Sequence, residues 1–535
     1  MMKPDPQASL VFQPHVHMGM QRGVNKIVGV IRPTLGPTPR VAVVDRILDS
    51  RIPEILDNGA VIAKRIIELH DRNEDAGAML VRDVIEHTSK QAGDGTATAA
   101  VIFQHVFNEG IRHLSYDGDV HVLREHLELG ATRVEEHLVE NADAVLGSEN
   151  LARLAETLCH DQDIAAIIGE AFETVGEYGR IEVRAGRRRE TEREYVEGMY
   201  WNSGAVSRSM LTDLGRSRTE FINGSILLSD IDVKDPRQLF PVVERALRDG
   251  ITSLLIVVEN ISDGALAFLG ANNDPEQLTT VVAKVPGWGK HENAAALEDL
   301  AILTGGTPFV AVAGDTFNSI TPEDFGHARR MWIAERTFGI VGGQGDSREL
   351  RRHINGLKDL YKSSEDQIRR DQLLARVGAL LGGSATLWIG GTTEIQIEER
   401  VEVAKRTVRA MRGAVAHGVV PGGGTALLAC RASLDSMMNR ASHPDARAAY
   451  RILGEAIAQP FRAIVTNAGY DVSEKMASVD QSEEGWGVDA RTGAITDMTA
   501  AGIVDAAAVQ RTAVHTAVTS AALALSVDVL VRRPR

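Results

Sequence analysis

Residues 93–100 (GDGTATAA) have the residue types and spacing of a phosphate-binding turn. Gly93 and Gly95 allow the backbone to turn sharply and to approach a ligand closely, and Thr96 and Thr98 supply hydroxyl groups at a predicted helix start. The free amides and the dipole of a helix start favour phosphate, and Asp94 offers a carboxylate to a Mg2+ that bridges phosphate oxygens. The same pattern also fits a helix that simply begins after a glycine, so the neighbouring motifs must decide between the two interpretations.

Three further turn-rich segments could contribute to such a site. Residues 419–425 (VVPGGGT) contain three consecutive glycines, whereas a plain turn between two helices needs only one. Residues 485–490 (GWGVDA) and 501–505 (AGIVD) precede the last predicted helix and could hold a base or a ribose, or form a simple hairpin. No spacing in the chain suggests a Ser/His/Asp or Cys/His nucleophile.

The composition excludes several classes of protein. The 535 residues are 44% hydrophobic and 24% charged, which indicates a folded protein of two to four domains. A net charge of −15 argues against a nucleic-acid surface, and no apolar run reaches the roughly 18 residues of a membrane span. Cys159 and Cys430 are too few and too distant for a disulfide framework, and residues 1–14 lack an export signal. We therefore expect a cytoplasmic protein with neither a nucleic-acid nor a membrane partner.

The pattern of apolar residues changes twice along the chain. Spacings of three and four predict helices over most of residues 20–139, interrupted by a Pro/Gly loop at 34–37, a strand at 41–44 and a turn at 57–59. From residue 179 to about residue 383 short strands alternate with helices, and mostly helical sequence returns from residue 398. The first and last parts of the chain are therefore expected to form one helical domain that carries an α/β insertion.

Taken together, these motifs resemble the group I chaperonins, the bacterial GroEL type. The resemblance covers about residues 20–531 in the family's order and with nearly its spacing, through residues 34–37 (TLGP), 58–59 (NG), 63–64 (AK), 93–96 (GDGT), 196–199 (VEGM), 303–307 (LTGGT), 419–424 (VVPGGG), 497–498 (DM) and 502–503 (GI). It implies a multidomain α and β chaperonin fold with a helical equatorial domain (1–141 and 417–535), a small intermediate hinge domain (142–197 and 384–416) and an inserted α/β apical domain (198–383). Gly198 and Gly383 fall where the family hinges.

The resemblance also implies partners and cofactors. It implies a homo-oligomeric ring, of seven subunits and often stacked in pairs, that encloses unfolded polypeptides and assists their folding. A co-chaperonin is a possible further partner, and whether one docks on this chain stays open at this point. It implies that the equatorial domain binds ATP and Mg2+, with Asp94 as the metal ligand. The implied nucleotide-binding positions are Thr34, Leu35, Gly36, Pro37, Asn58, Gly59, Asp94, Gly95, Thr96, Ala97, Thr98, Gly423, Asp489, Ala490, Ile503 and Asp505.

Two departures from the family concern ATP hydrolysis. The family has Asp-Gly where this chain has Asn58-Gly59, and it has a water-positioning aspartate where this chain has Arg406. A guanidinium cannot accept a proton, and losing a general base typically costs about 10²–10⁴-fold in rate. Asp57 and Glu402, which lies one helical turn before Arg406, are the nearby carboxylates that could substitute. We therefore expect ATP binding without fast turnover, and whether the chain is an ATPase stays open at this point.

The polypeptide-binding surface implied by the resemblance is also altered. Apolar residues remain at Met210, Leu239, Phe240, Val243 and Leu266, but Gly270 and Ala271 stand where the family has larger aliphatic residues. Since apolar contact contributes about 25 cal/mol per Å2, this loss should weaken the capture of generic unfolded chains.

Two hypotheses of different classes follow. The first is a nucleotide-binding chaperone that assists folding with weakened hydrolysis. The second is a ring-forming scaffold or holdase in which ATP is structural and never cycles. Phosphate release above background would favour the first hypothesis, and its absence would favour the second.

Overall fold

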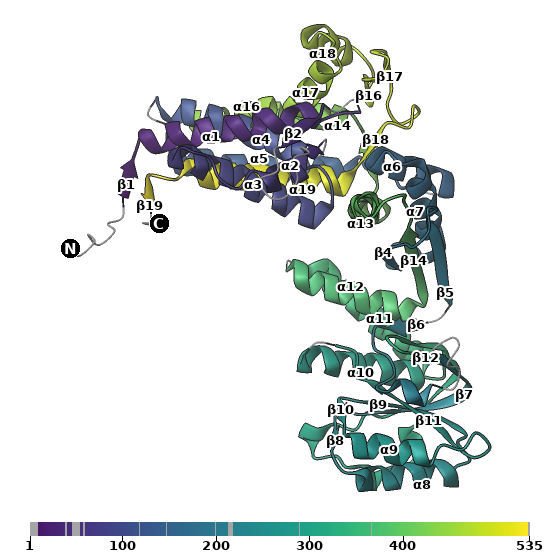
Figure 1. The fold of residues 1–535 in the computed structure, drawn as a ribbon. Helices are drawn as coiled ribbons and strands as arrows, with labels where there is room; N and C mark the ends of the chain where they lie inside the picture. Colours follow the sequence, from purple (N-terminus) through teal and green to yellow (C-terminus); the bar gives the residue numbers. More distant parts are fainter. Residues whose placement is uncertain are drawn as a thin grey trace. The chain divides into compact units, whose positions relative to one another are not determined.

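The computed structural model describes residues 9–37, 40–44, 54–56, 59–116, 118–145, 147–197, 199–211, 218–287, 289–364 and 366–532. It divides into two compact units, unit 1 with Met1–Glu173 and Gly391–Arg535, and unit 2 with Thr174–Gly390 (Figure 1). The chain thus leaves unit 1 and returns to it, in agreement with an insertion into a helical domain. The finer division into equatorial, intermediate and apical domains stays a prediction. Within the described ranges, no helix is both long and apolar enough to cross a membrane.

Unit 1 is mainly helical. Its helices are α1 (His15–Ile31), α2 (Gly59–Arg65), α3 (Arg72–Ala92), α4 (Thr96–Leu114), α5 (Val120–Glu140), α6 (Ser148–Cys159), α7 (Gln162–Val175, which ends just inside unit 2), α13 (Glu394–His417), α14 (Thr425–Ala429), α15 (Arg431–Arg440), α16 (Pro444–Ile457), α17 (Gln459–Asn467), α18 (Val472–Asp480) and α19 (Ala507–Leu525). Helices α1, α3, α4, α5, α16 and α19 lie side by side around one apolar core (Figure 1).

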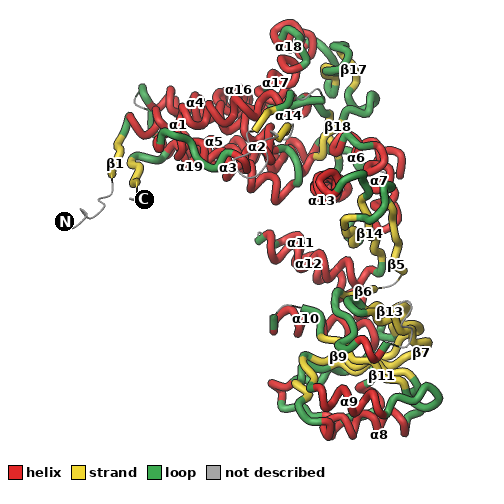
Figure 2. Tube along the Cα trace, viewed as in Figure 1, coloured by secondary structure: helices red, strands yellow, loops and turns green. Residues whose placement is uncertain are grey.

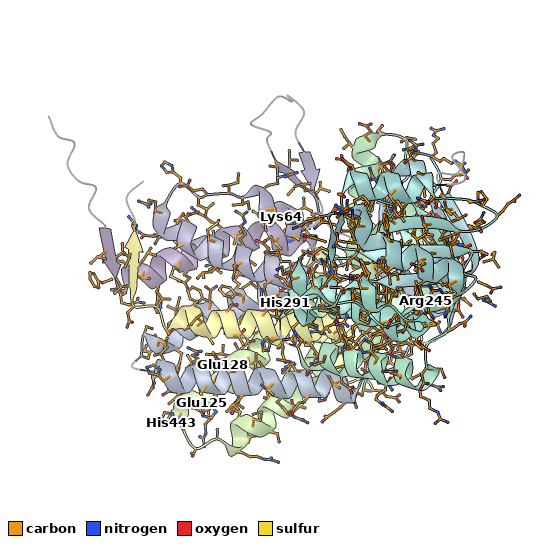
Figure 3. The ribbon with its side chains drawn as sticks, turned by 90° about the horizontal axis from the view of Figure 1, so that it is seen from below. Lys64, Glu125, Glu128, Arg245, His291 and His443 are labelled. Carbon is orange, nitrogen blue, oxygen red and sulfur yellow. The ribbon has the colours of Figure 1, made fainter. Side chains whose placement is uncertain are left out.

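Helix α5 illustrates how the spacing of apolar residues builds this core. Leu123, Leu127 and Val134 recur on one face of the helix and are fully buried. Glu125 and Glu128 lie on the opposite side, where they reach the surface (Figure 3). The side chain of Asp119 accepts hydrogen bonds from the first free amides of α5, so the polar end of the helix is satisfied as well.

Four short strand pairs complete unit 1. They are β1 (Ser9–Phe12) with β19 (Val529–Arg532), β2 (Ala42–Val44) with β3 (Glu54–Leu56), β15 (Val419–Pro421) with β18 (Val504–Ala506), and β16 (Trp486–Val488) with β17 (Ile495–Asp497), all antiparallel. Strands β1 and β19 bring the two ends of the described chain together at one end of the helices (Figure 2).

Unit 2 is built on a six-stranded mixed sheet in the order β11-β9-β7-β12-β13-β6. The strands are β6 (Met199–Trp201), β7 (Arg218–Leu228), β9 (Ser253–Val258), β11 (Thr279–Lys284), β12 (Gly326–Ala334) and β13 (Phe338–Gly343). Helices α8 (Phe240–Arg248) and α9 (Asp263–Ala271) lie on one side of the sheet, and α10 (Lys290–Thr304) lies on the other (Figure 1). A second sheet, β4-β14-β5, contains β4 (Arg180–Ala185), β14 (Gly383–Ile389) and β5 (Glu192–Glu197), and β8 (Asp232–Val233) pairs with β10 (Asn260–Ile261).

A buried ion-pair network joins α10 to α11 (Ser347–Ser363) and α12 (Gln367–Leu381). Asp299 is almost fully buried, and its carboxylate accepts hydrogen bonds from Arg376 at 2.7 and 2.8 Å and faces His353 Nε2 at 2.7 Å. Among the described residues, Glu298, Asp299 and His353 are the one group of three or more His, Cys, Asp or Glu side chains close enough together to hold a metal ion. Because Arg376 donates to both oxygens of Asp299, the charges of this network balance without a metal.

We expect Asp299→Asn to destabilise the protein by about 3 kcal/mol, because breaking a buried pair leaves the partner charge uncompensated. The check is the shift of the urea midpoint relative to the parent. Glu298→Gln is the matched control, since Glu298 is exposed and its contact with Arg376 is longer, at 3.2 Å. Equal shifts for the two variants would contradict the expectation.

Candidate functional site

The turn between α3 and α4 adopts the backbone shape that its glycines predict. Gly93 ends α3 with φ +77°, and its amide donates to the Ser89 carbonyl. Gly95 precedes α4 with φ +79°, and it has no side chain to cap the first amides of that helix. Thr96 and Thr98 are nearly buried in the first turn. An anion could therefore reach uncapped amides at the start of a 19-residue helix.

Two other helices press against this turn at its glycines. A Cβ atom on Gly95 would lie 2.7 Å from Val509 Cγ1 on α19, and one on Gly93 would lie 2.6 Å from the Arg406 carbonyl oxygen on α13. Both positions therefore require glycine for two reasons, the left-handed backbone and the close approach of a neighbouring helix. The turn is held between α13 and α19.

Asp94 and Asp505 lie near one another, although they are far apart in the sequence. Gln510 Nε2 donates to Asp505 Oδ2 at 2.9 Å. Part of the Asp505 residue stays exposed, but protein atoms surround its carboxylate, and this desolvation together with the negative charge of Asp94 raises the pKa of Asp505 to about 7. Two carboxylates that repel one another in this way favour a bound cation.

We expect Asp505→Asn to stabilise the protein without nucleotide above pH 7, by no more than about 4 kcal/mol. Because the folded pKa lies above the ordinary value of 3.8, the charged carboxylate favours unfolding, and stability is lost as pH rises from about 4 to 7. The stabilisation should thus grow between pH 5.5 and pH 8 in urea titrations. A stabilisation that is the same at both pH values would contradict this account.

The glycine triplet and the last turn segment meet at the strand pair β15–β18. Val420 pairs with Asp505, and the Gly422 amide donates to the Ile503 carbonyl at 2.9 Å. A Cβ atom on Gly423, which has φ +66°, would lie 3.0 Å from Met498 Cε and 3.8 Å from the Val488 carbonyl oxygen. Residues 422–424, 485–490 and 501–505 thus form one cluster that includes Asp489 and Ala490.

The Pro/Gly loop at residues 34–37 joins this cluster through α17. Asn467 Nδ2 donates to the carbonyls of Arg32 at 2.9 Å and Leu35 at 2.8 Å. A Cβ atom on Gly59 would lie 3.5 Å from Thr34 Oγ1 and 3.9 Å from Ala97 Cβ. The loop, the start of α2 and the start of α4 are therefore neighbours.

The structure brings together most of the residues that the sequence predicted. The turn 93–98, the loop 34–37, Gly59 and the cluster around Gly423, Ile503 and Asp505 all belong to unit 1 and contact one another in sequence-distant pairs. Asp489 is engaged locally, because its carboxylate accepts from the Arg491 amide at 2.9 Å and from Thr492 Oγ1 at 2.8 Å. Asp57, Asn58 and the predicted hinge residue Gly198 lie outside the described residues, and Gly383, the other predicted hinge residue, is the first residue of β14.

Sequence reasoning assigned no individual role to three residues of this region. Thr425 Oγ1 and Gln510 Oε1 are buried with no hydrogen-bond partner among the described residues, and Asn467 fixes the loop 34–37. Thr425 directly follows the glycine triplet, which is a usable signal. Gln510 and Asn467 lie within ordinary helical patterns and carry no signal of their own.

The donor set fits a nucleotide with its divalent cation. Two carboxylate oxygens suit Mg2+, which prefers oxygen ligands and keeps several waters. Uncapped amides at the start of α4 suit phosphate oxygens. The unpartnered polar atoms of Thr425 and Gln510 offer further hydrogen bonds to a ligand.

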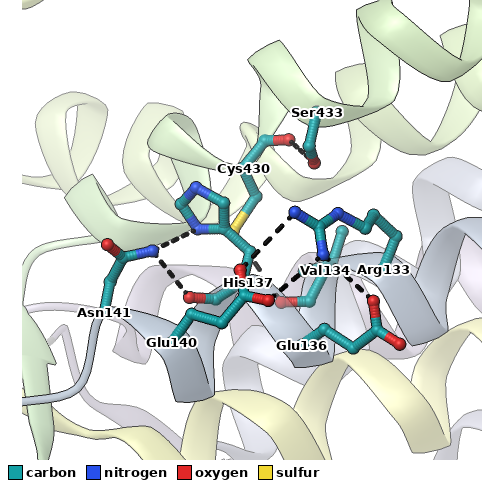
Figure 4. Close-up of polar contacts among 8 residues, drawn as sticks. All are labelled: Arg133, Val134, Glu136, His137, Glu140, Asn141, Cys430 and Ser433. Carbon is teal, nitrogen blue, oxygen red and sulfur yellow. Dashed lines mark hydrogen bonds and ion pairs between the residues drawn. The ribbon is translucent and has the colours of Figure 1, made fainter.

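The structure also brings together a cysteine and a histidine, a pair that no sequence pattern predicts. Cys430 Sγ lies 3.5 Å from His137 Nδ1, beside Arg133, Glu140 and Asn141 (Figure 4). Cys430 is fully buried, and burial raises the pKa of its thiol to about 12. The group is therefore a neutral thiol that donates to the Ala426 carbonyl at 3.2 Å, and it is not a nucleophile.

Arg406 lies on α13 beside the turn, and its carboxylate neighbour is engaged elsewhere. Glu402 is exposed and forms an ion pair with Lys405 at 2.9 Å. The alternative ion pair between Glu402 and Arg406, four residues apart on the same helix, is not formed. Glu402 is thus on the surface of α13 with a partner of its own.

The five apolar positions assigned to polypeptide binding divide into two groups. Met210 and Leu239 are buried in the core of unit 2. Phe240 is 49% exposed, and Val243 and Leu266 are half-buried. The Phe240 ring lies 5.0 Å from the Phe268 ring, so α8 and α9 share a partly exposed apolar surface.

Comparison with known families decides the identity of the fold. The sequence model of the TCP-1/cpn60 chaperonin family matches residues 27–535. This chain belongs to the TCP-1/cpn60 chaperonin family. The sequence-based identification of a divergent group I chaperonin is confirmed, and the chaperonin acts in protein folding.

Two solved structures share the fold of this chaperonin. Both are crystal structures of the chaperonin gp146 from bacteriophage EL (Pseudomonas aeruginosa), determined in the presence of ATP-BeFx. Crystal form I has a TM-score of 0.75 at 17% identity and covers 98% of this chain and 99% of that chain. Crystal form II has a TM-score of 0.65 at 17% identity, with 98% of both chains covered. The likeness extends over nearly the whole chain, which confirms the predicted fold class.

Proposed function

We propose that this chaperonin binds Mg2+ and ATP in unit 1, binds unfolded polypeptide on unit 2, assembles into rings and hydrolyses ATP slowly. The observation that carries the proposal is the electrostatic interaction of Asp94, on the glycine turn, with Asp505, on the strand that pairs with β15 just before the glycine triplet. The presence of an ATP analogue in the crystals of the gp146 chaperonin adds support.

The residues that would hold the nucleotide follow from their chemistry. The amides at the start of α4 would bind phosphate oxygens, and Asp94 would hold the metal ion. Gly36, Gly423, Ala490 and Ile503 would lie against the sugar and base. The bound metal supplies positive charge that polarises the phosphate oxygens.

The slow rate is proposed because Arg406 and Asn58 replace acidic residues of the family. Arg406 cannot act as a base, and Glu402 has Lys405 as an ion-pair partner on the exposed side of α13. The nucleotide would thus stay bound and unhydrolysed for long periods. Its binding, rather than its hydrolysis, would then set the state of the protein.

Polypeptide binding is supported by the apolar surface of Phe240, Val243, Leu266 and Phe268 on α8 and α9. Exposed apolar patches of this kind mark sites of interaction with other chains. Gly270 and Ala271 leave the end of α9 without large side chains, so we expect a narrow range of client proteins.

Ring assembly is supported by apolar residues on open strand edges. Leu10 and Phe12 of β1 pair with Val531 and Val529 of β19, and all four side chains are exposed on one face. Val43 on β2 is 65% exposed. Exposed edges with apolar side chains invite pairing with another chain, here a second copy in the ring.

We expect Val43→Glu and Phe12→Glu to convert the rings into monomers or small oligomers, since each introduces an unpaired charge into an apolar contact. Native mass spectrometry at physiological salt measures the outcome. Val30→Glu is the control, because Val30 is likewise exposed but belongs to helix α1 and not to a strand. Rings that persist in both test variants would contradict this assembly.

A second candidate function is a ring-shaped scaffold or holdase in which the nucleotide is purely structural, which the presence of Arg406 favours. The test combines phosphate release with the refolding yield of a chemically denatured, aggregation-prone enzyme, each with and without ATP. ATP-dependent refolding with measurable phosphate release supports the proposed chaperone. Suppression of aggregation without phosphate release supports the holdase, and failure of both assays overturns the proposal.

A further inference from the structure

Helix α13 meets the phosphate-binding turn at Arg406. The Arg406 carbonyl oxygen would lie 2.6 Å from a Cβ atom on Gly93, so only the absence of that side chain lets the helix approach. Gly93 directly precedes Asp94, which in turn lies near Asp505. The backbone of Arg406 is therefore next to the turn that holds Asp94 and the uncapped start of α4.

The neighbouring cations on α13 are engaged, whereas Arg406 is available. Lys405 pairs with Glu402 at 2.9 Å, and Arg409 Nη1 donates to the Ser89 carbonyl at 3.0 Å. The half-buried Arg406 forms no side-chain hydrogen bond or ion pair with any described residue. A half-buried cationic side chain whose backbone adjoins the turn, and which has no partner among the described residues, can be oriented by a ligand.

The negative charges at the turn favour a cationic side chain beside the bound phosphates. Asp94 and Asp505 place two carboxylates beside the amides that would hold phosphate, and both would repel a polyphosphate. A metal ion offsets part of this repulsion. The planar guanidinium of arginine matches phosphate geometry with paired hydrogen bonds and stays charged at any accessible pH.

We propose that Arg406 donates hydrogen bonds to the terminal phosphate of the bound nucleoside triphosphate, so that the site holds a triphosphate more tightly than a diphosphate. The inference rests on the proposed nucleotide site and deepens it. Where the family carries a residue that promotes hydrolysis, this chain would carry one that retains the unhydrolysed nucleotide.

The test compares the affinities of ADP and of a non-hydrolysable β,γ-imido ATP analogue by calorimetry, at a fixed Mg2+ concentration. Arg406→Gln should weaken binding of the triphosphate by about tenfold or more and of ADP by less than about threefold. Lys405→Gln is the charge-matched control, since it removes the same charge from the adjacent, exposed position and should change both affinities by less than about threefold.

The outcomes separate this inference from the proposed function. If the parent binds neither nucleotide, the nucleotide site itself is wrong. If the parent binds both and Arg406→Gln changes them equally or not at all, the site stands and the role of Arg406 is overturned. Should Arg406→Gln not fold, as judged by its melting curve, Arg406→Met keeps the apolar stem without the guanidinium and gives the same comparison.

Discussion

The double variant Asn58→Asp, Arg406→Asp is expected to hydrolyse ATP at least ten times faster than the parent, and up to about 10²–10⁴ times faster. Arg406 adjoins the turn through its contact with Gly93, so a carboxylate at this position starts close to the phosphate site. A carboxylate can accept a proton from, or orient, an attacking water, which a guanidinium cannot do. Steady-state phosphate release measures the effect.

In this variant the rate of ATP turnover should rise while the affinity for ATP should fall. The new aspartate removes the proposed phosphate donor and adds a third carboxylate beside Asp94 and Asp505, so KM should rise while kcat rises. The single variants separate the two contributions, and melting curves distinguish lost folding from absent chemistry. If the parent already releases phosphate at a rate typical of its family, Glu402 or Asp57 takes the role of the family's water-positioning aspartate. The interpretation of Arg406 is then wrong.

The turn at residues 93–98 could be predicted from the sequence because its conformation depends on local chemistry. Gly93 and Gly95 adopt positive φ, which side chains other than glycine rarely tolerate, and the helices on either side have clear apolar spacing. The insertion of an α/β unit into a helical one could be predicted for a similar reason, since strand and helix patterns differ in period.

The contacts between distant segments could not be predicted from such local patterns. Val509 and Arg406 lie against the two glycines because of the way α19 and α13 pack. The spacing of apolar residues in these helices does not specify that packing. Only the family resemblance predicted that Asp94 and Asp505 belong to one site. Nothing in the sequence predicted the hydrogen bond that Gln510 donates to Asp505.

Side-chain partners and burial on the surface were the least predictable features. Glu402 stands equally well placed in the sequence for Lys405 or Arg406, and the choice of Lys405 depends on rotamers and exposure. Met210 and Leu239 read as apolar in the same way as Phe240, yet tertiary packing buries the first two and exposes the third.

The second large effect is expected for Asp94→Asn, which should weaken Mg2+-dependent ATP binding by about 100-fold. The substitution keeps the size of the side chain and removes the charged oxygen that a hard cation prefers, and changes close to metal ligands typically cost 10–100-fold in affinity. It is a sharper test than Gly95→Val, since a side chain at Gly95 would collide with Val509 and strain a backbone at φ +79°.

Two measurements make the Asp94→Asn prediction specific to the metal. In the parent, calorimetry should show much weaker ATP binding when EDTA removes Mg2+, whereas in Asp94→Asn the affinity should be low with or without Mg2+. Since the charge of Asp94 helps to raise the pKa of Asp505, the variant should also lower that pKa, and the loss of stability with rising pH should end at a lower pH.

Asp497→Asn is the matched control, because the Asp497 side chain accepts hydrogen bonds from the Thr499 and Ala500 amides in a turn of the same unit. If ATP binding by the Asp94→Asn variant depends on Mg2+ as strongly as ATP binding by the parent does, Asp505 or another oxygen ligand holds the cation.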